Sequence, residues 1–228
     1  MKYLFCLVTI LLLGGSNGED TLFSTSYEKD DITTELEADL PAAIDAVHRS
    51  GIVSRGGKYS VRHKIANAKE YISHDAHRSE STTMHHQASR YSQGDHFRYQ
   101  FSVYLPANWE VDTRESVDIF WQFKRFEGGP DMFVAAKGRD IVLRSNGLNN
   151  RRQDPLIQDY TAGRWYDFRF DILWSTRAEG QLKAFVKSGD EKDYSEVLSF
   201  SGANIQNEKE NSAYPVSYTH LRAHETEA

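Results

Sequence analysis

The stretch HFRYQFSVYLP, residues 96–106, alternates apolar and polar residues over most of its length. In a β-strand successive side chains point to opposite faces, so this pattern gives one apolar face and one polar face. The apolar face would hold Phe97, Tyr99, Phe101 and Val103. The pattern therefore predicts a strand of an antiparallel sheet that buries one side and exposes the other.

Six further segments have the same strand character, with Gly, Pro or Asn at the joints between them. They are KYSVRHKIA (58–66), VDIFWQFKRF (117–126), DMFVAAKG (131–138), DIVLRSNG (140–147), WYDFRFDILWS (165–175) and GQLKAFVKSG (180–189). Seven strands joined by short turns predict an all-β antiparallel sandwich of the jelly-roll or concanavalin-like kind. The segment 40–51 instead predicts a short helix, because Pro41 would lie in its first turn and Gly51 after its end.

The two ends of the chain differ from its middle. Residues 1–18 carry a short apolar run followed by small residues, which predicts a signal peptide and a secreted, extracellular protein. Residues 19–44 read as an acidic arm and residues 45–215 as the sandwich domain. Residues 216–228, VSYTHLRAHETEA, have no strand pattern and resemble translated adapter or vector sequence. We therefore expect the protein's own C-terminal strand to be missing.

Charge is distributed unevenly in this chain of net charge −6. Residues 19–50 hold nine acidic against two basic residues, whereas residues 51–145 hold fourteen Lys and Arg against eleven Asp and Glu. A basic middle in an acidic protein favours a local anionic partner, such as an acidic polysaccharide. Predicted secretion and overall acidity argue against a nucleic-acid partner. We expect no membrane association, and a monomer.

Lys124 places an amine inside a strongly aromatic strand. Alternation would put Ile119, Trp121 and Phe123 in the core, and Phe120, Gln122 and Lys124 on the opposite face. Polar faces of other strands could extend this surface into one groove for an acidic polymer. The residues expected there are Arg62, Lys64, Arg78, Glu80, Arg98, Gln100 and Arg144. For any single strand, the alternative is the ordinary solvent face of a sandwich.

Four segments in order resemble the β-jelly-roll polysaccharide lyases, over roughly residues 50–213. They are HRSES (77–81), FRYQFSVYLPANW (97–109), DIFWQFK (118–124) and GRWYDFRFDILWSTRAEGQLKAFV (163–186). The group includes heparin-lyase-like, glucuronan-lyase-like and animal or viral alginate-lyase-like enzymes. The lysine of QFK, followed by GGPDMFVAAKG (128–138), is most similar to the alginate-lyase branch, because heparin-lyase-like members carry histidine at the position of Lys124.

The resemblance implies β-elimination from a uronic-acid polymer such as alginate, with no metal or other cofactor. A base removes the C5 proton beside the carboxylate, and the glycosidic oxygen leaves from C4. It implies Lys124 as the base, with Arg78 and Gln122 neutralising the carboxylate. Residues implied to hold neighbouring sugars are Arg98 and Arg144, with Gln100, Arg62, Lys64 and Glu80 as further binding candidates.

An amine with a reference pKa of about 10.4 is a poor base near neutrality. We expect Arg78, Arg125 and burial against Phe120 and Phe126 to lower the pKa of Lys124. The alternative is that Lys124 only binds a carboxylate, while a tyrosine or histidine is the base.

No general acid is evident from the sequence. The resemblance implies a tyrosine on a late strand after a proline-containing segment, but NSAYPV (211–216) runs directly into the foreign-looking tail. Tyr99 is expected in the core and Tyr218 in that tail, so both are poor candidates.

Two other functions remain open: a non-catalytic carbohydrate-binding lectin and a sandwich glycoside hydrolase. EKDYSE (191–196) has the carboxylate spacing of some hydrolases, but neighbouring Gly and Lys residues favour a turn. HDAH (74–77) and MHH (84–86) are interpreted as loop histidines rather than a metal site, and NNRRQD (149–154) as a polar turn.

Overall fold

The computed structural model describes the backbone of residues 2–7, 13–14, 20–28, 37–39, 43–66, 68–73, 76–111, 117–206 and 213–221, and all structural statements here concern these ranges. Their regular structure is almost entirely β-strand, with two one-turn 3₁₀ helices, η1 (Lys69–Tyr71) and η2 (Gln87–Ser89). Within these ranges, no helix has the length and apolar character needed to cross a membrane.

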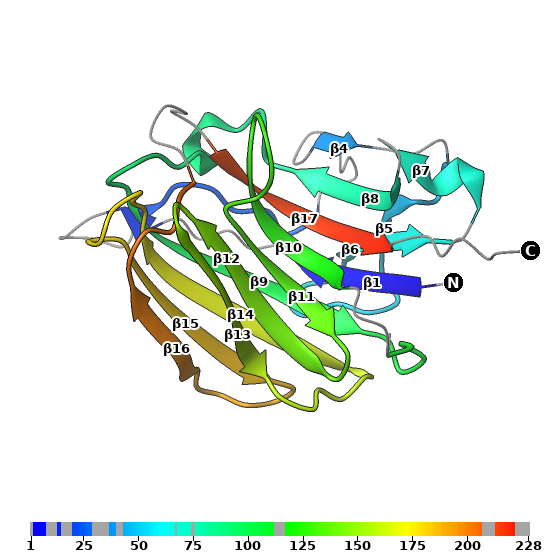
Figure 1. The fold of residues 1–228 in the computed structure, drawn as a ribbon. Coiled ribbons are helices and arrows are strands. Elements are labelled where there is room, and N and C mark those ends of the chain that lie inside the picture. The colour runs from blue at the N-terminus through cyan, green and yellow to red at the C-terminus, as the bar shows by residue number, and fades with distance from the viewer. Residues whose placement is uncertain are drawn as a thin grey trace, which may run out of the picture.

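The strands form two large antiparallel sheets (Figure 1). In spatial order, the seven-stranded sheet consists of β16 (Ser195–Ser201), β15 (Gln181–Ser188), β14 (Arg164–Leu173), β9 (His96–Leu105), β1 (Lys2–Leu7), β6 (Ser60–Ile65) and β5 (Val47–Ser50). The eight-stranded sheet consists of β13 (Asn150–Ile157), β12 (Asp140–Gly147), β11 (Met132–Lys137), β10 (Asp118–Arg125), β17 (Ala213–Leu221), β8 (Ala76–Thr82) and β4 (Glu37–Asp39), with β7 (Ile72–Ser73) also paired to β8. A small separate sheet pairs β2 (Leu13–Gly14) with β3 (Asp20–Thr21).

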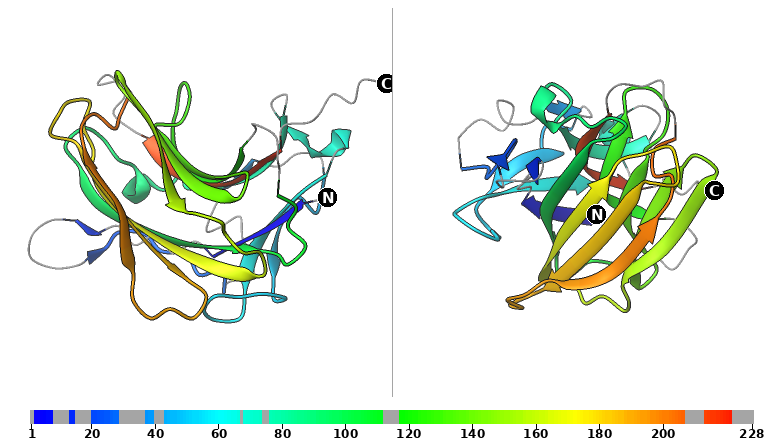
Figure 2. Two further views of the ribbon diagram at one scale, coloured as in Figure 1. Left: turned by 60° about the horizontal axis from the view of Figure 1, so that its bottom comes forward. Right: turned by 90° about the vertical axis from the view of Figure 1, so that its left-hand side faces the viewer.

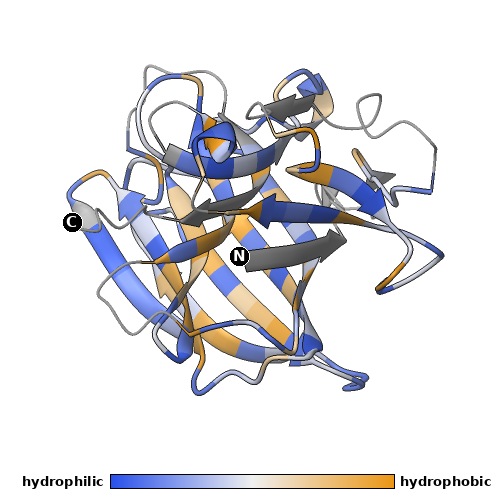
Figure 3. Cartoon of the chain, turned by 90° about the vertical axis from the view of Figure 1, so that its right-hand side faces the viewer, coloured by the Kyte–Doolittle hydropathy of each residue, from blue (hydrophilic) through white to orange (hydrophobic). Residues whose placement is uncertain are grey.

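The two large sheets lie one over the other and curve in the same sense, as the left view of Figure 2 shows. Their inward faces make one core, and their outward faces point in opposite directions. Figure 3 shows the alternation of apolar and polar residues along the strands that this arrangement requires. The predicted all-β antiparallel sandwich is therefore confirmed.

Aromatic pairs join the sheets across the core. Phe101 on β9 stacks on Trp121 of β10 with ring centroids 4.3 Å apart, and Tyr91 stacks on Trp174 at 3.8 Å. The Trp174 indole also donates a hydrogen bond of 2.8 Å to the hydroxyl of Tyr99. Such pairs contribute about 0.5–1.5 kcal/mol each beyond the apolar area they bury. The Phe101–Trp121 pair holds β10 against β9 from its inward side.

A buried histidine joins β6 to β8 at the other end of the core. His63 Nδ1 lies 2.9 Å from Ser79 Oγ, and its Nε2 lies 3.4 Å from Ser81 Oγ. Complete burial lowers the pKa of His63 to about 3, because an imidazolium there would lose its hydration. Since Ser79 and Ser81 point inward, alternation turns the residues between and before them, Glu80 and Arg78, outward.

All seven segments predicted as strands form strands, namely β6, β9, β10, β11, β12, β14 and β15. The predicted helix over 40–51 is wrong in its described part, because residues 47–50 form β5 and pair with β6. NNRRQD is not a turn: Asn150–Ile157 is the edge strand β13. β13 lies at the edge of its sheet, where Pro155 removes no central ladder hydrogen bond.

The faces of β10 differ from simple alternation at one point. Pairing with β11 shifts register between Ile119 and Trp121. Because of this irregularity Phe120 joins Trp121 and Phe123 in the main core, while Ile119 packs with Val216 and Met84 instead. The prediction for these two residues was therefore wrong, and Gln122 and Lys124 keep the outward face.

Both chain ends take part in the sheets. Strand β1 lies between β6 and β9, and β17 lies between β10 and β8. The strand position expected to be vacant at the C-terminal end is thus filled by residues 213–221. Neither pairing tests whether residues 1–18 are a signal peptide or whether residues 216–228 are foreign, so both interpretations stay predictions.

Candidate active site

The outward side of the eight-stranded sheet brings together residues from strands far apart in the sequence. Lys124 and Gln122 lie two positions apart on β10, and Arg78 and Glu80 lie two positions apart on β8. Strand β17 runs between these two strands and pairs with both. The three strands therefore form a continuous platform about 10 Å wide, measured from β8 to β10.

Glu80 is the point where the two cations meet. Arg78 Nη1 donates a hydrogen bond of 3.3 Å to Glu80 Oε1, and Lys124 Nζ lies 3.9 Å from Glu80 Oε2. The Glu80 side chain is 4% exposed, against 16% for Arg78 and 28% for Lys124. The structure thus brings three of the predicted site residues into one cluster whose cations face solvent more than its acid does.

Gln122 and Arg144 lie in one register row across the sheet. Gln122 is the register partner of Phe133, Phe133 of Arg144 and Arg144 of Gln153. The Arg144 guanidinium lies 5.2 Å from the Phe133 ring centroid and donates a hydrogen bond of 2.7 Å to Gln153 Oε1. Since two strand spacings separate β10 from β12, Arg144 lies about 10 Å from Gln122 on the same side of the sheet.

Four other predicted groove residues lie on the opposite sheet. Arg98 and Gln100 belong to β9, and Arg62 and Lys64 belong to β6, both strands of the seven-stranded sheet. The alternating pattern correctly predicted that these side chains face away from the core. They do so on the outer face of the seven-stranded sheet, however, and not on that of the eight-stranded sheet. The expectation that all polar faces combine into one groove is therefore wrong, because the sequence pattern does not say which sheet a strand joins.

Three of these four residues have side-chain partners of their own. Arg98 donates two hydrogen bonds to Asp171, of 2.6 and 3.2 Å. Lys64 hydrogen-bonds to Asp45, which raises the pKa of Lys64, and an Arg62 Nη2 lies 3.2 Å from His48 Nδ1. Their roles as sugar ligands remain untested predictions.

Three of the four neighbours expected around the Lys124 amine lie elsewhere, and only Arg78 is in the same cluster. Arg125 points to the other side of β10, where its Nε lies 3.7 Å from the buried carboxylate of Asp131. Phe120 is in the core, and Phe126 is 44% exposed beneath the guanidinium of Arg90. The neighbour that the expectation left out is Glu80, a carboxylate.

Strand β17 adds Tyr214, which the sequence reasoning did not weigh, and brings Tyr218, judged a poor candidate, into the sheet. Tyr214 is the register partner of Lys124, and Tyr218 is the register partner of Glu80. Tyr214 lies before the foreign-looking tail and beside Pro215, so the proline-containing segment was the signal that could have drawn attention to it. Tyr99, as expected, is fully buried in the core.

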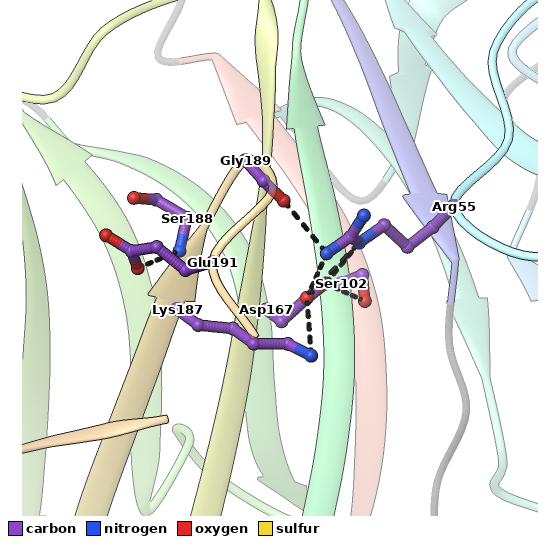
Figure 4. A network of polar contacts seen from close by, with 7 residues as sticks. All are labelled: Arg55, Ser102, Asp167, Lys187, Ser188, Gly189 and Glu191. Carbon is purple, nitrogen blue, oxygen red and sulfur yellow. Dashed lines mark hydrogen bonds and ion pairs between the residues drawn. The ribbon is translucent and has the colours of Figure 1, made fainter. Parts of the chain in front are cut away.

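A second buried carboxylate lies on the outward side of the seven-stranded sheet (Figure 4). Asp167 accepts hydrogen bonds from Arg55 Nε at 2.9 Å, Arg55 Nη2 at 2.7 Å and Ser102 Oγ at 2.6 Å. Lys187 Nζ lies 3.6 Å from the same carboxylate. The Asp167 hydrogen bond raises the pKa of Arg55. An open pocket of about 520 Å³ lies beside this network, with Tyr104, Trp165 and Arg164 among its lining residues.

The weaker chemical motifs do not form sites in the described part of the chain. No group of three or more His, Cys, Asp or Glu residues there could hold a metal ion. His74 of HDAH lies outside the described residues, and His77 is buried. Most of EKDYSE forms the turn between β15 and β16, as its lysines and glycine indicated.

Comparison with known proteins gives a family match and several structures of similar fold. The family described as "Polysaccharide lyase" matches residues 25–220. The endo-β-1,4-glucuronan lyase of the fungus Trichoderma reesei is similar over 78% of this chain and 75% of its own, with 18% identity and a TM-score of 0.59. No curated protein sequence matches at a significant level.

Two other solved structures are similar at lower scores. The binding domain of botulinum neurotoxin serotype G has 15% identity and a TM-score of 0.44, with 96% of this chain and 49% of that chain covered. The marine PL-14 alginate lyase from Aplysia kurodai has 9% identity and a TM-score of 0.42, with 94% and 99% covered. At these identities the likeness to the glucuronan lyase concerns the fold, and the two lower scores carry no argument.

Proposed function

Because the chain belongs to the polysaccharide lyase family, we propose that it cleaves a uronic-acid polymer by β-elimination on the outward side of its eight-stranded sheet. The observation that carries this proposal is the cluster of Arg78 and Lys124 around Glu80. Gln122 lies two residues before Lys124 on β10. We include in the proposal that the substrate is alginate or a related polyuronate and that the protein acts as a secreted monomer.

The chemistry requires a group that holds the sugar carboxylate. The C5 proton is weakly acidic while the neighbouring carboxylate keeps its charge, because its removal creates a second negative charge on the same system. Arg78 presents a fork of N–H donors that matches a carboxylate, and Gln122 offers an amide donor from β10. Donors placed where charge develops lower the barrier more than they strengthen ground-state binding.

Proton removal then falls to Lys124. Its neutral amine takes the C5 proton, the C5–H electron pair forms the C4=C5 double bond, and the C4–O bond breaks toward the leaving sugar. The leaving oxygen needs a proton, and Tyr214 is our candidate donor because it is the register partner of Lys124 on the adjacent strand. The two products are a new reducing end and an unsaturated uronate.

Incubation of the purified chain with polyuronates tests the proposal. Substrates are alginates rich in mannuronate or in guluronate, and glucuronan, with a neutral β-glucan as control. The expected result is new ultraviolet absorbance from the α,β-unsaturated carboxylate of the product, in step with new reducing ends, on at least one polyuronate and not on the β-glucan. Reducing ends without that absorbance would indicate a hydrolase, and binding without either product would indicate a lectin.

A further inference from the structure

Glu80 is a buried acid in a site proposed for an acidic polymer. Its side chain is 4% exposed, so it offers almost no surface to a sugar. A uronate carboxylate carries the same charge as Glu80, and like charges so close together repel. A role for Glu80 as a sugar ligand is therefore at odds with both its burial and its charge.

The contacts of Glu80 point instead to the two cations. One carboxylate oxygen accepts from Arg78, which comes from the same strand. The other oxygen lies near Lys124, which comes from β10 on the far side of β17. Both cations have long flexible side chains, and a fixed anion between them restricts where their charged ends can lie.

The distances leave both cations able to turn toward a substrate. At 3.3 and 3.9 Å, these contacts are longer than the 2.7–2.9 Å typical of a strong charge-assisted hydrogen bond. Arg78 and Lys124 also remain partly exposed, at 16% and 28%. Glu80 can therefore align the two groups while their outer faces stay available.

We propose that Glu80 is a positioning residue, whose carboxylate holds the Arg78 guanidinium and the Lys124 amine in fixed positions on either side of β17. This inference rests on the proposed function: it sets the Lys124 amine beside the C5 proton of a sugar whose carboxylate lies on Arg78. Displacement of a reacting group by about 1 Å costs on the order of 100-fold in rate. The effect of Glu80 should thus appear in kcat and act through its two neighbours.

Kinetics of Glu80→Gln and Glu80→Asp test this role. Gln keeps the size of the side chain without its charge, and we expect kcat to fall about 100-fold with KM within about twofold. Asp keeps the charge on a shorter stem and should give an intermediate kcat. Glu196→Gln, at an exposed position on β16, is the control and should leave both constants unchanged. A raised KM with normal kcat, or normal values for both, would overturn the proposal.

Chemical labelling separates this inference from the proposed function. Acetylation of Lys124 and of the exposed Lys183, followed by peptide mass spectrometry, reports how well each amine is held without any need for turnover. In Glu80→Gln, or in Glu80→Asp where Gln prevents folding, labelling of Lys124 should rise several-fold while that of Lys183 stays constant. Unchanged labelling of Lys124 would overturn the positioning role. If the unsubstituted chain cleaves no polyuronate, the proposed function fails, and labelling still decides whether Glu80 holds the amine.

Discussion

Two buried carboxylates lie on opposite outward faces of the sandwich, and each is shared by one arginine and one lysine. Glu80 has Arg78 and Lys124 on the eight-stranded sheet, and Asp167 has Arg55 and Lys187 on the seven-stranded sheet. Exposure is nearly the same in both clusters: 4 and 5% for the acids, and 16–28% for the cations. Composition and burial alone do not tell the two clusters apart.

Geometry does. Arg55 grips Asp167 through two nitrogens at 2.7–3.2 Å, Ser102 adds a third donor, and Arg55 also donates to the Gly189 carbonyl. An arginine bound to a carboxylate through two nitrogens and to a backbone carbonyl anchors the loop around residue 55 to the sheet. The contacts that Glu80 makes with Arg78 and Lys124 are longer, and these two residues lie on strands separated by a third. The tightly bonded Asp167 cluster therefore stabilises the fold, and the looser Glu80 cluster is suited to bind and react with a substrate.

The largest expected difference between the clusters concerns their lysines. Lys124→Ala removes the proposed base, so kcat for elimination should fall by about 100- to 10,000-fold, the usual contribution of base catalysis. Lys187→Ala, the matched change on the other face, should leave kcat unchanged. The rate at which the ultraviolet absorbance of the unsaturated product rises on a polyuronate measures both values of kcat. Substantial turnover by Lys124→Ala would remove the base assignment.

As with the two lysines, substitution of Arg78 should reduce activity far more than substitution of Arg55. Arg78→Ala should lower kcat/KM about 100-fold, because one preorganised donor to a developing anion contributes that much. Arg55→Ala should leave kcat/KM per folded molecule unchanged. Titration of folded protein by circular dichroism corrects both values for unfolded material. Equal losses in the two variants would mean that the looser contacts of Glu80 do not mark a working site.

Substitutions should reduce the free energy of unfolding more at the Asp167 cluster than at the Glu80 cluster, the reverse of their expected effects on activity. Asp167→Asn removes a buried charge from a bidentate arginine and should lower the free energy of unfolding by about 3 kcal/mol. The same change at the looser cluster, Glu80→Gln, should cost about 1 kcal/mol or less, in keeping with its longer contacts. Denaturant unfolding followed by tryptophan fluorescence measures both. A larger loss at Glu80 would contradict the division of roles.

The sequence predicted these clusters only in part, and the reason is visible at particular residues. Alternation found the outward direction of Lys124, Gln122, Arg98 and Gln100, because direction within a strand follows from the backbone alone. It did not find that β9 and β10 belong to different sheets, because pairing depends on contacts distant in the sequence. One groove was therefore predicted where two separate faces exist.

Local departures from regularity account for the remaining differences. The register shift after Ile119 moved Phe120 into the core, and no residue type in that segment signals a bulge. The polar strand β13 was taken for a turn because an edge strand needs few apolar residues. Asp167 was not considered as a partner for Arg55, since 112 positions separate them in the chain.

The free energy of unfolding should depend on pH through His63, which is buried beside Ser79 and Ser81 on β8. The folded pKa of His63 is about 3 and the unfolded value is about 6.5, so the unfolded chain binds the proton first. The stability due to neutral His63 is therefore full above pH 6.5 and is lost as pH falls toward 3. Between pH 7 and pH 5 we expect a loss of about 2 kcal/mol that His63→Gln lacks. Unfolding of both proteins at the two pH values measures the difference, and parallel losses would exclude His63 as the cause.

The smallest expected difference concerns arginines farther from either cluster. Arg144 lies in the register row of Gln122, stacked on Phe133, where a long polymer bound at Gln122 could reach it. Arg144→Ala should raise KM about threefold for long polyuronates, as expected for a partly solvated ion pair, and leave KM for short oligomers unchanged. Arg98→Ala, which breaks a pair with Asp171 on the other face, should change neither value. A KM increase for Arg98→Ala equal to that for Arg144→Ala would mean that the polymer also contacts the seven-stranded face, and the distinction between a structural face and a working face would no longer hold.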